Sequence, residues 1–177
     1  MPIFGKGKTK ITEEEFALAL STLLKMRLSH EQLNETAALI NFDISKEKNF
    51  ERLFNELYKL NMWIITHSCE RIFDDIEKRD KCLDIFHRQI HQAYNKAIKE
   101  QVSFDDWILD MVTKYSEYND ALVSDKPPGH LWALARVLNI GIFGKLNKDV
   151  FIHTALGEYI GSGIKTTEST LKQYMVS

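Results

Sequence analysis

The chain has 177 residues, of which 44% are hydrophobic and 11% aromatic, enough apolar material for the core of one ordinary domain. Its 23 basic and 25 acidic residues give a formal net charge of -2, so no overall charge attracts nucleic acid or anionic lipid. Two cysteines, Cys69 and Cys82, are too few for a disulfide scaffold. We therefore expect a cytoplasmic protein with buried, reduced thiols.

No segment of the sequence is predicted to cross a membrane. The most apolar stretch, LWALARVLNIGIFGKL, is interrupted by Arg136 and Asn139 and is shorter than the roughly 20 residues that a bilayer span needs. The basic start of the chain is followed by Glu13 and two further acids, an order that does not fit a secretory signal. We expect a single helical domain over residues 1–177, with residues 1–11 as a basic, flexible N-terminal arm.

Two capping patterns predict the first helices. Thr12 is followed three residues later by a glutamate, and Ser29 by a glutamine, so that each pair can satisfy free backbone amides reciprocally. These starts predict one helix that ends near Leu28 and a second that ends near Ile40.

A long helical pattern begins near Lys46. Apolar residues recur in it at steps of three and four, at Leu53, Leu57, Leu60 and Ile64. Residues 62–65 are apolar in succession, which is typical of a helix buried on more than one side, so we expect this helix to be central. The pattern continues toward Glu100, far beyond an ordinary helix length. We expect the chain to reverse within the charged segment 74–80 and form an antiparallel helical hairpin, with the second helix capped by Asp80.

Further helices are predicted in the last third of the chain. Ser103 with Asp106 three residues later predicts a helix whose outer face is acidic, a pattern that usually marks a solvated surface. Residues 124–129 form a predicted Pro/Gly loop, and a helix from His130 to about Phe143 follows. The fold class is therefore all-α, a single-domain multi-helix bundle of about six to eight helices around the central helix.

The core face of the central helix becomes polar in its second half. The helical stripe continues into His67, Ser68 and Arg71 instead of further aliphatic residues. If the chain reverses near Glu77, His67 faces His87, because antiparallel helices share the same rise per residue. These two histidines, with the serine and the arginine, are the candidate ligand-binding residues.

The same hairpin offers a candidate transition-metal site, which consists of His67, Glu70, Asp84, His87 and His91. Their spacings of three and four resemble the way helical bundles bring imidazoles and carboxylates to a di-metal centre. Against this interpretation, His91 and Asp84 rotate toward solvent, and no further helix contributes matching carboxylates. A structural role for these side chains is therefore preferred, and no cofactor is favoured.

The sequence contains no recognisable nucleophile–base pair and no phosphate-binding loop, so catalytic residues cannot be named and a non-enzymatic role is favoured. We expect a helical interaction or regulatory module with a protein partner or self-association. One alternative is a bundle that binds a small ligand or metal in the hairpin of residues 46–100. A weaker alternative is helix-turn-helix DNA binding through residues 30–54, although Glu47 and Glu51 would then meet phosphates.

Overall fold

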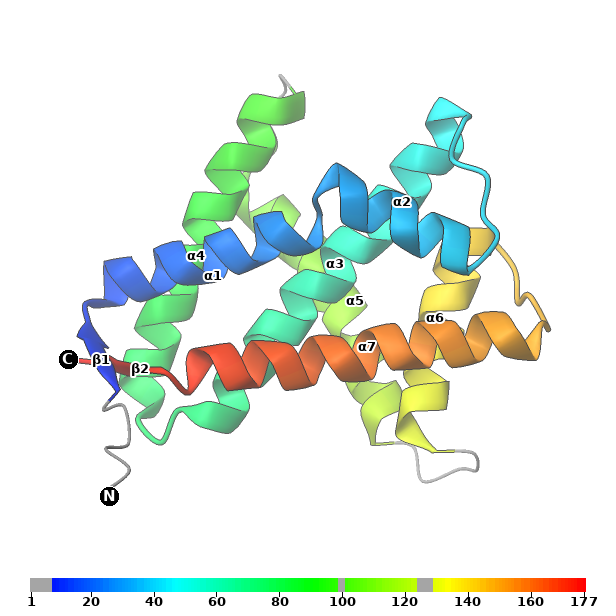
Figure 1. Cartoon of the computed structure of the whole chain (residues 1–177). Helices are drawn as coiled ribbons and strands as arrows, with labels where there is room; N and C mark the ends of the chain where they lie inside the picture. The colour runs from blue at the N-terminus through cyan, green and yellow to red at the C-terminus, as the bar shows by residue number, and fades with distance from the viewer. Residues whose placement is uncertain (1–7, 99–100, 124–128) are drawn as a thin grey trace.

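The computed structural model describes residues 8–98, 101–123 and 129–177 (Figure 1). Within these ranges the chain forms seven helices and a two-stranded ribbon, which confirms the predicted all-α multi-helix bundle. None of the helices in this part of the chain combines the length and apolar character that a bilayer crossing requires.

The two ends of the described chain lie side by side (Figure 1). Strand β1, Thr9–Ile11, pairs in parallel with β2, Tyr174–Val176, with Thr9 opposite Tyr174. Residues 9–11 of the predicted flexible arm are thus a strand, because Ile11 and its neighbours in β2 pack against the core. Residues 1–7 of that arm lie outside the described residues.

Helices α1, Glu13–Arg27, and α2, His30–Leu39, begin where the capping patterns predicted. Thr12 Oγ1 accepts a hydrogen bond from the backbone N–H of Glu15, and the Glu15 carboxylate accepts one from the backbone N–H of Thr12. Ser29 Oγ accepts the backbone N–H of Gln32, but the Gln32 side chain donates to Glu35, so the predicted reciprocal bond is not made. Local sequence alone sets these two helix starts.

Helix α3, Glu47–Ile72, is the predicted central helix, and its stripe of Leu53, Leu57, Leu60 and Ile64 is fully buried. Helix α4, Ile76–Ile98, begins four residues before the predicted Asp80. The reason is that Asp75 Oδ1 accepts the backbone N–H of Lys78 and so holds the first turn. The chain reverses at residues 73–75, at the edge of the predicted segment 74–80.

Helices α5, Phe104–Leu122, α6, His130–Phe143, and α7, Val150–Leu171, complete the bundle. Ser103 caps α5 as predicted, through the backbone N–H of Asp106. Of the predicted loop 124–129, only Gly129 lies within the described residues, and it is the residue before α6. Helix α3 is contacted by α1, α5, α6 and α7, so it is covered on several sides (Figure 1).

Candidate functional site

The structure gives His67 contacts within its own helix. Its ring stacks on that of Trp63, with centroids 5.0 Å apart and planes 9° from parallel. Its Nδ1 lies 3.9 Å from a carboxylate oxygen of Glu70, and its Nε2 is buried without a hydrogen-bond partner in the described part of the protein. Burial lowers the pKa of His67, so its ring favours the neutral form.

His87 lies opposite Thr66 instead of His67. His87 Nε2 is 3.5 Å from Thr66 Oγ1. The predicted reversal point was nearly correct, but a shift of one residue turns a helical position by about 100°, which moves His67 away from the contact. Burial lowers the pKa of His87 to about 4, so this imidazole is uncharged at neutral pH.

Ser68 and Arg71, the remaining predicted ligand-binding side chains, have contacts of their own. Arg71 Nε lies 2.9 Å from a carboxylate oxygen of Glu168, which joins α3 to α7. Ser68 is buried, and its hydroxyl has no hydrogen-bond partner among the described residues. Asp84 is exposed on α4. Arg71 therefore contributes to the packing of two helices.

His91 holds the segment that leads into α5. Its Nε2 lies 2.8 Å from the carbonyl oxygen of Val102. The side-chain amide of Asn95, one turn along α4, donates to the same carbonyl and accepts from the backbone N–H of Val102. This pair of side chains fixes the approach of the chain to Ser103, the cap of α5.

Within the described residues, no group of three or more His, Cys, Asp or Glu side chains lies close enough to hold a metal ion. Of the five side chains predicted as metal ligands, His67 and Glu70 lie together, while His87 and His91 have contacts elsewhere. Cys69 and Cys82 are buried and unbridged, as expected. Burial raises the pKa of both thiols, that of Cys82 to about 11, so neither is a reactive thiolate at neutral pH.

A groove of about 550 Å³ lies between α1, α3 and α4. Three of its lining residues are charged or amide side chains: Lys25, Glu51 and Asn55. The other ten are aliphatic or aromatic, and they are Leu24, Leu28, Phe50, Phe54, Tyr58, Ile90, Ala93, Tyr94, Ala97 and Ile98. Its walls are therefore mostly apolar.

One wall of the groove is a ladder of four nearly parallel aromatic rings, which we call the aromatic ladder: Phe50, Phe54, Tyr58 and Tyr94. Successive ring centroids are 6.4, 6.1 and 6.3 Å apart, and successive planes differ by 16°, 9° and 18°. The first three rings follow one face of α3, because residues four apart lie above one another on a helix. Tyr94 extends the ladder onto α4.

Sequence reasoning did not identify this groove. Its signal was a second apolar stripe at Phe50, Phe54 and Tyr58, immediately beside the core stripe that includes Leu53 and Leu57. A single stripe suffices to bury one face of a helix. The extra aromatic residues therefore indicated a second contact surface on the first half of α3.

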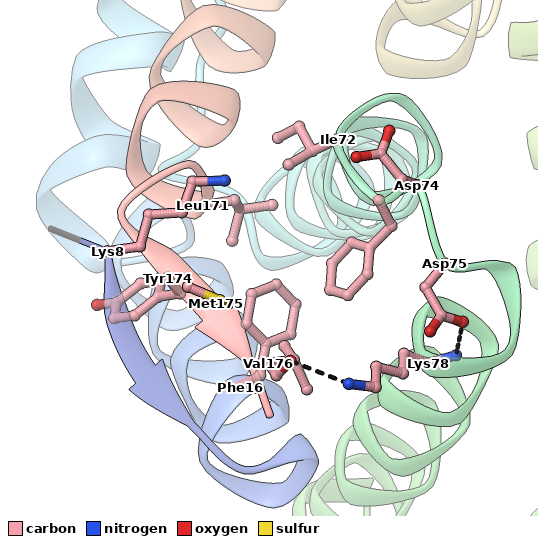
Figure 2. A pocket seen from close by; sticks show the side chains of 11 residues that line it. Lys8, Phe16, Ile72, Asp74, Asp75, Lys78, Leu171, Tyr174, Met175 and Val176 are labelled. Carbon is pink, nitrogen blue, oxygen red and sulfur yellow. Dashed lines mark hydrogen bonds between the residues drawn. The ribbon is translucent and has the colours of Figure 1, made fainter.

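A smaller cavity of about 200 Å³ lies where the terminal ribbon meets the α3–α4 turn (Figure 2). The ring of Phe16 packs edge-to-face against that of Phe73, with centroids 5.1 Å apart. Lys78 Nζ donates to the carbonyl oxygen of Val176, as the dashed line in Figure 2 shows. This cavity is a junction of structural contacts, and the groove of α1, α3 and α4 is the better candidate site.

Comparison with known proteins adds no functional assignment to this geometry. No protein-family model, curated protein or solved structure matches the chain.

Proposed function

We propose that this protein is a non-catalytic binding protein that holds a small, apolar molecule in the groove between α1, α3 and α4. The observation that carries the proposal is the aromatic ladder, in which Phe50 and Phe54 are only half-buried although they lie beside the core. A ligand in the groove would remove these rings from water, which is favourable in proportion to the apolar area covered.

The size of the groove supports a small molecule. Its volume of about 550 Å³ lies within the roughly 300–1,000 Å³ that is typical of small-molecule sites. Thirteen residues line it, fewer than the roughly 20–30 that each partner contributes to a standard protein interface. A few polar groups among apolar walls are also typical of ligand sites, since they orient the bound molecule.

The proposal keeps the sequence-based alternative of a small ligand in the hairpin of residues 46–100, but it assigns the ligand to other side chains. The predicted site at His67, Ser68, Arg71 and His87 stays a prediction, as do the protein partner and self-association. The DNA-binding alternative also stays a prediction. In the helix that would read DNA, the side-chain amide of Asn49 donates to the carbonyl oxygen of Asp43 within the protein.

The experiment is a titration with N-phenyl-1-naphthylamine, a neutral apolar dye whose fluorescence rises in apolar surroundings. We expect saturable binding at one site in the wild-type protein. Ala93→Trp and Ala97→Trp each place a large ring in the groove and should weaken dye binding at least tenfold. Ala38→Trp, at an exposed position on α2 outside the groove, is the matched control and should bind like wild type.

Circular dichroism of each variant confirms that it is folded before its affinity is compared. The proposal is wrong if the wild-type protein does not bind the dye. It is also wrong if folded Ala93→Trp and Ala97→Trp both bind the dye as tightly as wild type, because the dye then lies elsewhere.

A further inference from the structure

The groove is elongated along three helices. Its lining residues recur at steps of three and four, from Phe50 to Tyr58 on α3 and from Ile90 to Ile98 on α4, with Leu24 on α1 and Leu28 directly after it. The two centroid spacings of the aromatic ladder along α3, 6.4 and 6.1 Å, make this wall longer than a single ring. A compact ring system would leave most of such a wall uncovered.

One end of the groove is closed by contacts between the helices. Tyr58 and Tyr94 stack across it, with ring centroids 6.3 Å apart. Beside Ile90, the Ser21 hydroxyl on α1 donates to the side-chain oxygen of Gln89 on α4, at 3.1 Å. The helices α3 and α4 lie near each other at the turn that joins them and diverge toward the start of α3 and the end of α4 (Figure 1).

Two charged side chains are among the described residues that line the groove, and Lys25 lies one helical turn beyond Ser21. Lys25, near the end of α1, and Glu51, near the start of α3, line the groove and are exposed. Among the described residues, neither has an oppositely charged side chain within 4.0 Å. The groove is therefore mostly apolar and carries one charged side chain from α1 and one from α3.

We infer that the ligand is the extended acyl chain of an amphiphile. The chain end lies at the closed end between Tyr58, Tyr94 and Ile90, and the polar head group lies at the mouth beside Lys25 and Glu51. This inference rests on the proposed function and specifies its ligand class. A partner helix fits less well, because a helix laid along the groove would meet the closed end.

The experiment is calorimetric titration with octanoate, decanoate and dodecanoate, each below its micelle-forming concentration. Because each buried methylene contributes about 0.8 kcal/mol, we expect affinity to rise roughly threefold to fourfold per added methylene. Affinity that does not rise with chain length overturns the inference. The proposed function is still supported in that case if N-phenyl-1-naphthylamine binds and Ala97→Trp blocks its binding. If neither the dye nor the fatty acids bind, both proposals are wrong.

Two variants test the orientation of the chain. Ile90→Phe adds volume at the closed end, so it should weaken dodecanoate at least fivefold and change octanoate less than twofold. An equal loss for both chains contradicts the assigned direction. Ala97→Trp, nearer the mouth, should weaken both chains and serves as the comparison.

Lys25→Gln and Glu51→Gln test the position of the head group. Because exposed ion pairs contribute at most about 1 kcal/mol, Lys25→Gln should weaken dodecanoate by no more than about fivefold, and Glu51→Gln should strengthen it by a similar factor. Dodecanol, which has the same chain and no charge, should bind both variants like wild type. Dodecanoate affinity that changes in neither variant contradicts a head group at this mouth.

Discussion

At the scale of single residues, His87 couples stability to pH. Its pKa in the folded protein, about 4, lies below the value of about 6.5 in an unfolded chain. Between these values the unfolded state binds the extra proton, so the free energy of unfolding falls as the pH falls. The variant His87→Gln keeps a polar group near Thr66 but cannot gain the proton. We predict that between pH 7 and pH 4.5 the wild-type protein loses about 2.5 kcal/mol more stability than this variant.

Urea unfolding of wild type and His87→Gln at the two pH values measures this difference. His67 and the carboxylates titrate in both proteins, so the comparison isolates His87. An equal loss of stability in the two proteins would show that His87 is already protonated in the folded state or is neutral in both states.

The residues around His87 also show where sequence reasoning ends. The polar interruption of the apolar stripe on α3 was predicted at His67, Ser68 and Arg71, whereas the side chain that meets His87 is Thr66. Which of these faces α4 depends on a rotation of about 100° per residue. The angle at which α4 crosses α3 fixes that rotation, and it results from packing against α1, which is distant in sequence.

At the scale of helices and strands, the starts of α1, α2 and α5 could be predicted from the sequence, whereas the start of α4 could not. Thr12, Ser29 and Ser103 each cap a helix as predicted, because a cap needs only the backbone amides within three residues. Asp80 was predicted as the cap of α4, whereas Asp75 holds its first turn. The choice of Asp75 accompanies the packing of Phe73 on Phe16, a contact with α1 that no local pattern contains.

The packing of α1, α3 and α7 depends on Gly163. The guanidinium of Arg27 lies against this glycine, bonds to Asn61 and sits 5.3 Å from the ring centre of Tyr159. A methyl group at Gly163 would overlap the Arg27 guanidinium and press on Ile64. We predict that Gly163→Ala costs about 1–2 kcal/mol, since overpacking outweighs the better helix propensity of alanine.

Chemical denaturation compares this variant with Gly157→Ala, where the nearest atom is 3.8 Å from the added carbon. That control should be stabilised by about 0.5–1 kcal/mol, because alanine favours the helix and nothing must move. In an Arg27→Ala background, Gly163→Ala should cost less. If the two glycine variants are equally stable in the wild-type background, the close contact with Arg27 does not constrain α7.

At the scale of the whole molecule, the approximate number of helices was predictable, but neither α7 nor the groove was located from the sequence. The helix α3 was identified as central because residues 62–65 are apolar in succession. The groove exists because α3 and α4 separate beyond Tyr58 and Tyr94 while α1 crosses beside them. Its side chains come from three separate parts of the chain, so the spacing of residues within one helix does not predict that they lie together.

The terminal ribbon closes the molecule at the end away from the groove. Tyr174 lies on the Phe16 ring, with centroids 6.3 Å apart, and Ser177 donates its backbone N–H to the carbonyl oxygen of Ile11. We predict that deletion of residues 174–177 lowers stability by about 2 kcal/mol, since two half-buried side chains lose their packing. For a chain of this size the melting temperature should fall by about 4–8 °C.

Thermal unfolding followed by circular dichroism checks the fall, with Met175→Ala as the control because Met175 is 44% exposed and should matter little. Since no residue of the ribbon lines the groove, the shortened protein should bind N-phenyl-1-naphthylamine with unchanged affinity below its melting temperature. A melting temperature equal to that of wild type would mean that the ribbon adds nothing to stability. A lower melting temperature with intact binding would show that the two ends of the bundle act independently, the ribbon in stability and the groove in binding.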